Sequence, residues 1–330
     1  MKKIKNILKH IIPPSYLCFE HKIICLKDYM QGQFEFQNSQ LSILMDNNRQ
    51  LSTNLEMIFQ KNLEILNYVS SMGKDIETLV ETLNDTKEVH QKQLDNLIQI
   101  QTNNIKTSRL INELLWGEIF NSSIINSKWL IDKTFAPGRW AVGYSYLYVM
   151  YRVLNELKPK SIIELGLGQS TRMISQYAHM HSDIEHIVVE HDQSWIDFFC
   201  QDFLPSERTQ IIRLDLELAD HNEAKSVRSY KGFKELFLGK KFDFILIDAP
   251  QGGDMKQYSR IDLLSIFPEC LKDSFVIAID DCQRSGERHT VQEMEDILKA
   301  RNILYVKGKY GGSKDSIFLC SEDLSFVSTM

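Results

Sequence analysis

Carboxylates follow two apolar runs in the second half of the chain. Asp248 ends the run FDFILID, and Asp280 and Asp281 end the run FVIAIDD. Apolar runs of this length indicate buried strands, and in a parallel sheet the carboxyl ends of the strands meet at one edge. Three carboxylates there repel one another unless something neutralises them, and a hard divalent cation does so. We therefore predict a metal site; the alternative is that one acid is structural and the others titrate alone.

A glycine-rich turn lies upstream of these acids. Residues 160–171, KSIIELGLGQST, form an apolar run followed by Gly166, Gly168 and Ser170 at alternate positions. Glycine can adopt positive φ and lets a ligand lie against the backbone, and the helix predicted from Thr171 adds free N–H groups and a partial positive charge. The turn predicts a nucleotide-like ligand, although a plain tight turn would carry the same glycines.

Glu190 makes this turn more specific. It ends the next apolar run, 22 residues beyond Gly168. An acid in that place can accept hydrogen bonds from both ribose hydroxyls of a nucleoside. We expect Glu190 to hold a ribose; the alternative is a solvated acid at the end of a strand.

Strand and helix patterns alternate from residue 160 onward, which predicts a parallel sheet with helices on both faces. The seven predicted strands are 161–165, 186–190, 210–214, 242–248, 275–280, 303–307 and 316–320, with the last two as an antiparallel pair. The predicted helices are 144–157, 171–180, 195–203, 224–237, 258–271 and 290–300. This α/β arrangement would gather the turn and the acids at one edge.

These motifs, over about residues 136–320, resemble those of class I methyltransferases that use S-adenosylmethionine. ELGLGQST, Glu190, LIDAP and AIDD stand in that family's order, with Ser170 in place of a third glycine, and the final antiparallel pair fits its sheet. The resemblance implies a Rossmann-like seven-stranded domain and S-adenosylmethionine as cofactor. It implies these cofactor contacts: Glu164, Gly166, Gly168 and Ser170 around the methionine part, Glu190 at the ribose, and Asp215 near the adenine.

Two narrower resemblances concern the acids. Asp248, Asp280 and Asp281 are similar to the ligands of metal-dependent O-methyltransferases of the catechol type, with Asp281 where that group usually has Asn. The runs IDAPQG and DDCQR resemble the glucuronoxylan 4-O-methyltransferase family, with Asp280 in place of a His. These resemblances imply Mg²⁺ or a similar divalent metal and a sugar hydroxyl as the methyl acceptor.

The general base and the substrate contacts have several candidates. The catechol group has a Lys three residues after its strand-end acid, where this chain has Gln251, so we consider Asp248, Lys256 and His289 as the base. The loop 137–144 either covers the ligand or packs its aromatic residues on the sheet. The candidate substrate contacts are Arg139, Trp140, Arg260 and Arg284. The last two arginines can pair with a sugar carboxylate or form surface salt bridges.

The first third of the chain carries no chemistry and predicts a stalk. Between Gln37 and Trp116 there is no proline, and the only glycine is Gly73. Apolar residues recur at steps of three and four from residue 41 to residue 83, with Asn48 and Asn62 where a buried Asn fixes a two-stranded register. We predict a coiled coil that forms a homodimer; the alternative is a helical hairpin folded on itself or on the catalytic domain.

We therefore predict three domains: a basic amphipathic segment at 1–36, the stalk at 37–116 and the methyltransferase domain at 117–330. The first twelve residues place lysines opposite an apolar face, which indicates either a weak membrane-surface anchor or a helix packed on its own protein. The net charge of −6 argues against nucleic acid as a partner. Six scattered cysteines and no apolar run of 18 residues predict a cytoplasmic protein, peripheral to the inner membrane face.

The predicted enzyme is an S-adenosylmethionine-dependent O-methyltransferase (EC 2.1.1.-), assisted by a metal, that acts on a sugar hydroxyl of a cell-surface polysaccharide or glycan. One alternative is a metal-independent methyltransferase of a small metabolite or nitrogen acceptor. Another is a coiled-coil scaffold whose methyltransferase-like domain is catalytically idle.

Overall fold

The computed structural model describes residues 14–68, 75–138 and 140–330, without the side chains of 14–21, 23, 64, 66–68 and 75–81. The basic start at residues 1–12 and Arg139, for which we made predictions, lie outside the described residues. The chain divides into two compact units, Met1–Ser108 and Arg109–Met330. The second unit therefore begins eight residues before the boundary predicted at 117.

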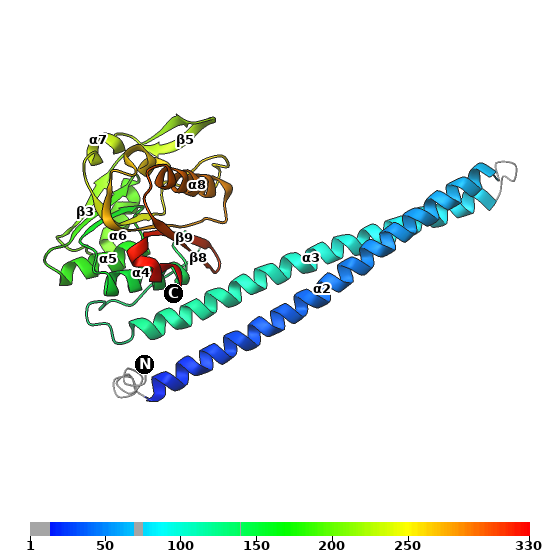
Figure 1. Ribbon diagram of the computed structural model, residues 1–330, viewed down its shortest axis with the longest axis horizontal. Coiled ribbons are helices and arrows are strands. Elements are labelled where there is room, and N and C mark those ends of the chain that lie inside the picture. The colour runs from blue at the N-terminus through cyan, green and yellow to red at the C-terminus, as the bar shows by residue number, and fades with distance from the viewer. Residues whose placement is uncertain (1–13, 69–74, 139) are drawn as a thin grey trace. The chain divides into compact units, whose positions relative to one another are not determined.

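A seven-stranded sheet forms the centre of the second unit (Figure 1). Its strands are β1 (Ser161–Leu165), β2 (Glu185–Glu190), β3 (Thr209–Arg213), β6 (Phe242–Ile247), β7 (Leu271–Ile279), β8 (Tyr305–Gly311) and β9 (Asp315–Ser321). They lie in the order β3-β2-β1-β6-β7-β9-β8, and β9 runs antiparallel to both its neighbours. The predicted Rossmann-like methyltransferase fold, with its reversed last hairpin, is confirmed.

Helices cover both faces of this sheet because successive strand residues point to opposite sides. Besides the last part of α3 (Asp75–Ile124), the helices of this unit are α4 (Tyr144–Glu156), α5 (Gln169–Met180), α6 (Gln193–Asp202), α7 (Phe233–Phe237) and α8 (Ser285–Ala300), with the 3₁₀ turn η2 at Glu322–Ser328. Ile162 of β1 packs in one core with residues of α4 and α5, whereas its neighbour Ile163 packs in a second core with residues of α7 and α8. Both cores consist of fully buried aliphatic and aromatic side chains.

The helix predicted at 224–237 is present only at its end, as α7, and the helix predicted at 258–271 is wrong. Residues 224–230 form a strand, β5 (Ala224–Tyr230), that pairs with β4 (Leu216–His221) in a separate hairpin. Residues 258–271 hold only the 3₁₀ turn η1 (Asp262–Ile266) before β7 begins. Ser226 and Arg260, which lie inside the two predicted helices, have φ values of 57° and 58°, and this left-handed conformation does not continue an α-helix.

The first unit consists of α2 (Pro14–Tyr68) and the first part of α3 (Asp75–Ile124). Leu41 and Asn48 of the predicted seam are buried, while Leu44 and Leu51, which alternate with them, are more than half exposed. The long helices are confirmed, and the coiled-coil dimer stays a prediction.

The described helices do not include one that is both long and apolar enough to cross a membrane.

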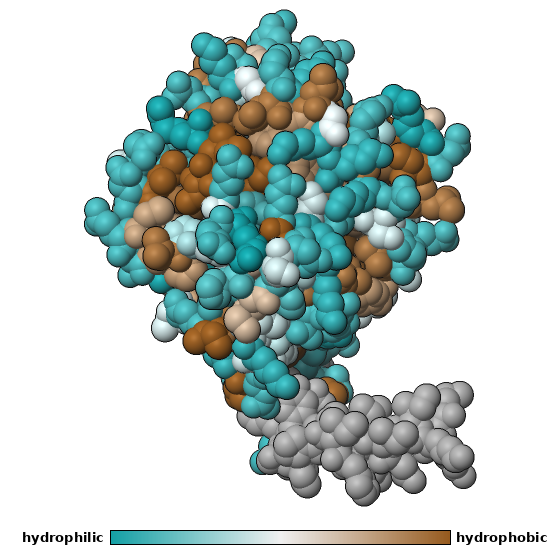
Figure 2. Space-filling view, turned by 90° about the vertical axis from the view of Figure 1, so that its left-hand side faces the viewer, coloured by the Kyte–Doolittle hydropathy of each residue, from teal (hydrophilic) through white to brown (hydrophobic). Residues whose placement is uncertain are grey.

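Figure 2 shows hydrophobic side chains in several groups among hydrophilic ones on the face toward α5 and α6. Exposed apolar side chains on these elements include Met180 and Phe198.

Candidate cofactor pocket and acid cluster

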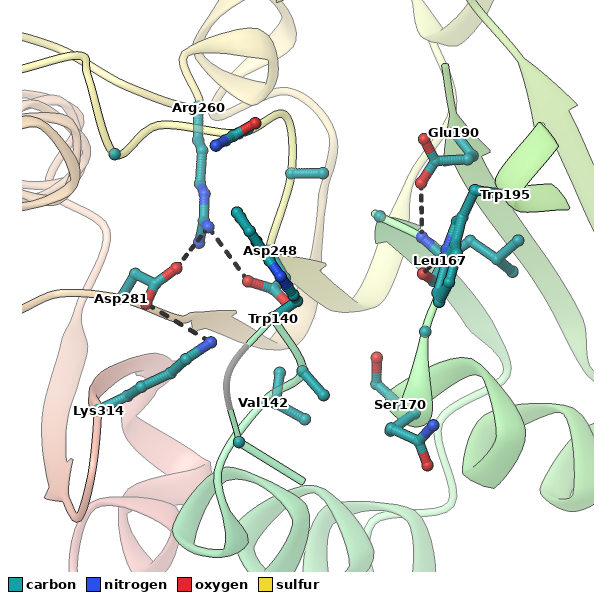
Figure 3. A pocket seen from close by; sticks show the side chains of 18 of the residues that line it. Trp140, Val142, Leu167, Ser170, Glu190, Trp195, Asp248, Arg260, Asp281 and Lys314 are labelled. Atoms are coloured by element: carbon teal, nitrogen blue, oxygen red, sulfur yellow. Dashed lines mark hydrogen bonds and ion pairs between the residues drawn. The ribbon is translucent and has the colours of Figure 1, made fainter. Parts of the chain in front are cut away.

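A cavity of about 370 Å³ opens at the carboxyl edge of the sheet (Figure 3). Ligand pockets are typically about 300–1,000 Å³ in volume. Gly166, Gly168 and Ser170 line the cavity from the turn after β1, Glu190 lines it from the end of β2, and Asp248 follows β6. The structure therefore brings these five predicted site residues, among others, into one space.

The turn after β1 requires glycine at one position and leaves open space at the other. Gly166 has a φ of +107°, and a Cβ there would lie 2.9 Å from the Cβ of Ala249. Gly168 is extended, and a Cβ added to it would meet no atom within 4 Å. The backbone of the turn is therefore bare where it borders the cavity, as a close-lying ligand requires.

Glu164 supports this turn from behind and does not line the cavity. Its buried carboxylate accepts hydrogen bonds from the hydroxyls of Ser170 and Thr171, the latter at 2.7 Å. Ser170, at the position of the third glycine, thus ties the start of α5 to β1. We predicted Glu164 next to the methionine part. The structure instead places its carboxylate behind the turn, against Ser170 and Thr171, and outside the residues that line the cavity.

Glu190 is buried and oriented by three backbone amides. Its Oε2 accepts from Leu167 N at 3.1 Å, and its Oε1 accepts from His191 N at 2.7 Å and Asp192 N at 3.0 Å. A carboxylate offers about four lone-pair sites, so the group retains capacity for a ligand hydroxyl. These amides hold the carboxyl group in place beside the cavity.

Trp195 is a cavity residue that the sequence analysis missed. Its indole Nε1 donates to Leu167 O at 2.7 Å, and its ring stacks on Phe198 at 5.5 Å. It lies in the first turn of α6, three residues after the N-cap Asp192. An aromatic ring five residues beyond the strand-end acid was the available signal.

Asp215 is not among the residues that line the cavity. Its carboxylate is exposed and forms an ion pair with Arg213 at 2.6 Å. The structure does not bring this predicted adenine contact to the other cofactor residues.

Asp248, Asp280 and Asp281 do come together, with one oxygen of each lying within 4.8 Å of the others. Two cationic side chains lie among them (Figure 3). Arg260 Nη2 is 3.1 Å from Asp248 Oδ1 and 2.8 Å from Asp281 Oδ2. Lys314 Nζ is 3.2 Å from Asp280 Oδ2 and 3.6 Å from Asp281 Oδ1.

These contacts leave little room for a divalent cation. Asp280 Oδ1 accepts from Ser316 Oγ at 2.9 Å and Asp281 Oδ1 from Gln283 Nε2 at 3.1 Å. Among the described residues, five of the six carboxylate oxygens therefore have a donor, and Asp248 Oδ2 is the one without. A Mg²⁺ or Ca²⁺ ion needs several oxygen ligands at about 2.0–2.6 Å. Because most of these carboxylate oxygens already contact protein cations or hydroxyl and amide donors, the cluster does not fit the predicted metal.

The environment of these acids sets their pKa values apart. Burial raises the pKa of Asp248 to about 7, even though the Arg260 charge acts in the opposite direction. Burial also acts to raise the pKa of Asp281, but Arg260, Lys314 and Arg284 outweigh it, so this pKa lies below its usual value. Asp248 is 21% exposed at its side chain and lines the cavity. It is the acid placed to accept a proton from a bound molecule.

The other candidate bases lie elsewhere. Lys256 and His289 are exposed and are not cavity residues, and His289 Nδ1 lies 2.5 Å from Gln257 O. Of the three candidates, the structure places Asp248 alone at the cavity.

The predicted substrate residues fall into different settings. Trp140 lines the cavity and is 81% exposed. Arg284 also lines it, and its contacts with Asp281 and Glu287 both use Nη1. Arg260 is only 3% exposed and its N–H groups point to protein oxygens, so a substrate carboxylate would have to displace them.

Glu113 on α3 fixes two loops beside the cavity, and the sequence offered no signal for it. Its carboxylate accepts from Tyr144 N at 2.7 Å, after the loop that carries Trp140, and from Ser313 N at 2.7 Å, next to Lys314. One side chain thus holds both segments by charge-assisted hydrogen bonds.

Neither a family model nor a curated relative matches the sequence. Similar solved structures include a putative caffeoyl-CoA O-methyltransferase from Staphylococcus aureus, which is 15% identical with a TM-score of 0.39, over 64% of this chain and 100% of that one. An O-methyltransferase from Bacillus cereus in complex with SAH is 12% identical with a TM-score of 0.40, over 64% and 90% of the two chains. TomG, an O-methyltransferase from Streptomyces achromogenes in complex with SAM, is 13% identical with a TM-score of 0.35, over 52% and 77%. Likeness at this level does not assign an activity to this chain.

Proposed function

We propose that the chain is an S-adenosylmethionine-dependent O-methyltransferase. The observation that carries this proposal is that Glu190, the bare glycine turn and Asp248 border the same cavity. The methionine part would lie over residues 166–170, and the ribose hydroxyls would donate to Glu190. The sulfonium methyl would then point toward Asp248, on the other side of the same cavity.

The proposed reaction is an in-line displacement. The acceptor hydroxyl oxygen attacks the methyl carbon, the carbon–sulfur bond breaks with its electron pair on sulfur, and the hydroxyl proton passes to Asp248 Oδ2. Asp248 fits the role of base because its free oxygen borders the cavity and its pKa is raised to about 7. Proximity and orientation of the two reactants provide most of the acceleration.

We propose a sugar hydroxyl as the acceptor, in a cell-surface polysaccharide or glycan. Trp140 offers an exposed ring at the cavity, and flat apolar faces of this kind pack against sugar rings. Arg284 has its Nε and Nη2 available for the carboxylate of an acidic sugar, because its protein contacts use Nη1. Both residues favour a polar, ring-shaped acceptor.

The stalk and the basic start remain proposals about location. We propose that the stalk pairs two copies of the chain, since Leu44 and Leu51 of the heptad seam are exposed in the single chain. Together with the lysine-rich first residues, a dimer would keep a cytoplasmic enzyme at the inner membrane face, where glycans are assembled. Analytical ultracentrifugation tests the dimer, and vesicle flotation of the full chain tests the membrane contact.

Isothermal titration with S-adenosylmethionine tests the cofactor. The intact chain should bind one molecule, and Glu190→Ala should weaken binding by at least ~100-fold, because two hydrogen bonds to a carboxylate are lost at about 1.5–3 kcal/mol each. Glu185→Ala is the matched control, since this exposed residue starts the same strand and pairs only with Lys240. Circular dichroism must show that Glu190→Ala is folded, and absence of binding by the wild type at millimolar cofactor refutes the proposal.

Asp248→Asn tests whether the domain is an enzyme or an idle part of a scaffold. Cofactor binding should be retained within a few-fold, whereas methyl transfer to surface glycan should fall by roughly 10²–10⁴-fold without the base. A cell phenotype that is lost on deleting the gene but persists with Asp248→Asn would favour the scaffold.

A further inference from the structure

We infer that the acid cluster at the ends of β6 and β7 is neutralised by the chain itself, through Arg260 and Lys314, and that the site works without a divalent cation. The statement that catalysis needs no divalent cation rests on the proposed methyl transfer. The statement that Arg260 and Lys314 neutralise the acids rests only on the arrangement of charges, which does not depend on what the site binds.

Arg260 is built into the sheet edge. Its Nε donates to Pro250 O, its Nη1 to Ile247 O and Asp280 O, and its Nη2 contacts Asp281 Oδ2 and Asp248 Oδ1. These five contacts match the five N–H groups of a guanidinium, one at Nε and two at each Nη. Since three of the acceptors are backbone carbonyls, the side chain cannot leave without stranding buried groups on both sides.

The backbone is shaped to hold this pair of charges. Arg260 and Asp281 both adopt left-handed φ values, 58° and 60°, which cost free energy in residues other than glycine. Both are also buried, and their side chains meet at 2.8 Å. Strained positions of this kind persist where the surroundings impose them, and they concentrate at functional sites.

Lys314 completes the neutralisation from the other side. It precedes β9, which runs antiparallel to β7 with Ile279 opposite Ile317, so residues before β9 lie beside the acids after β7. Lys314 Nζ donates a hydrogen bond to Asp280 Oδ2, and Ser316 Oγ donates one to Asp280 Oδ1. Both oxygens of Asp280 therefore already have a donor from the chain, and a cation would have to compete with the Lys314 charge for them.

The charges of the cluster nearly balance. Three aspartates and the buried Glu287, which lies 3.9 Å from Arg260 and 3.4 Å from Arg284, face three cationic groups: Arg260, Lys314 and Arg284. With four carboxylates and three cations, the group is one positive charge short of neutral. A divalent ion would therefore leave this largely buried group with an excess of positive charge, and it would have to compete with Arg260 for the same oxygens. Arg260 instead holds Asp248 Oδ1 and leaves Oδ2 toward the cavity, so it is a positioning residue for the proposed base.

Manganese binding measured by electron paramagnetic resonance tests this inference, with the full chain in saturating S-adenosylhomocysteine. We expect the wild type to leave Mn²⁺ free at up to about 1 mM, the range of weak, nonspecific sites. Methyl transfer after dialysis against chelator should stay within about twofold, because no step depends on a metal. One Mn²⁺ per wild-type chain that is lost in Asp281→Asn, or activity that chelator removes and Mg²⁺ restores, overturns the inference.

Two variants sharpen the test. Arg260→Met and Lys314→Met each remove one internal cation and leave the aspartates in excess, so each should acquire Mn²⁺ affinity that the wild type lacks. Arg301→Met is the control, because this exposed arginine pairs with Glu269 away from the cavity. If Arg260→Met does not fold, Lys314→Met and the wild type still decide. Two folded variants that leave Mn²⁺ free would contradict the assignment of Arg260 and Lys314 as substitutes for a metal.

Cofactor titration on the same samples separates the inference from the proposed function. Binding of S-adenosylmethionine in chelator supports both. Cofactor binding together with a stoichiometric Mn²⁺ site in the wild type overturns the inference and leaves the methyltransferase standing. Failure to bind cofactor refutes the methyltransferase, and the manganese result alone then decides how the acids are neutralised.

Discussion

Replacing Glu113 by Gln should loosen at least one of the two loops at the cavity without changing a residue that lines it. The carboxylate accepts at Oε1 from Tyr144 N and at Oε2 from Ser313 N and Ser313 Oγ. A Gln amide has one oxygen and one NH₂ group, so it can accept on one side and must turn a donor toward the other. At least one loop therefore loses its hydrogen bond to residue 113. The backbone N–H of that loop, at Tyr144 or Ser313, then faces the NH₂ group of the glutamine, which is also a donor.

The size of the effect follows from the bonds that are lost. A hydrogen bond to a charged group contributes about 1.5–3 kcal/mol, so Glu113→Gln should destabilise the second unit by roughly 2 kcal/mol. For a unit of this size, about 1 kcal/mol shifts Tm by roughly 2–4 °C, which predicts a decrease of about 4–8 °C. Local opening of the Tyr144 or Ser313 amide should become about 10–100-fold more frequent.

Hydrogen exchange read by mass spectrometry, together with thermal melts, measures both effects. The matched control is Glu118→Gln, the same substitution at an exposed position on the same helix. Faster exchange should be confined to peptides around residues 136–144 and 311–315. Equal melting temperatures and equal exchange in the two variants would refute Glu113 as the anchor of the loops.

Three further substitutions test the glycine turn after β1, a buried acid in the protein interior and an exposed aromatic residue at the cavity. Gly166→Ala should lower Tm and weaken binding of S-adenosylmethionine in titrations, because the new Cβ meets Ala249 at 2.9 Å in a backbone of φ +107°; unchanged values would show that the turn tolerates a side chain. Asp262→Asn should stabilise the protein increasingly as pH rises from about 4 to about 7 in thermal melts, because burial raises the pKa of Asp262 to about 7. The folded wild type then keeps a proton that the unfolded chain has released, so its stability falls over this range and levels off above it; a pH-independent difference would contradict this. Trp140→Ala should leave Tm unchanged, since the ring is 81% exposed, but raise KM for the proposed glycan acceptor in methyl-transfer assays; an unchanged KM would remove Trp140 from the proposed acceptor site.

The sequence was sufficient for the parts of the site that follow from strand ends. Glu190 and Asp248 each close an apolar run, and parallel strands bring such residues to one edge by geometry alone. Gly166 was equally readable, since a positive φ beside a strand end is what a glycine there indicates. These residues border one cavity in the structure, as predicted.

The role of Arg260 could not be predicted from local pattern. It lies in a segment that we predicted as a helix, and its five partners come from two segments separated along the chain, 247–250 and 280–281. Lys314 was closer to prediction, because the antiparallel pairing of the last strand places the residues before it at the acid edge. Combining that register with the strand-end acids would have suggested an internal cation instead of a metal.

The β4–β5 hairpin was missed for a different reason. Its strands are short and their burial alternates irregularly, so neither the period of a helix nor that of a strand is clear. Asn222 in left-handed conformation at the turn was the available sign of a hairpin.

The most direct test of the account is a crystal structure of the chain with S-adenosylhomocysteine, grown in the presence of chelator. The account predicts the ligand over residues 166–170, with both ribose hydroxyls on Glu190 and the sulfur facing the free oxygen of Asp248, while Arg260 keeps its place between Asp248 and Asp281. A ligand bound outside this cavity, or none at millimolar concentration, would contradict it.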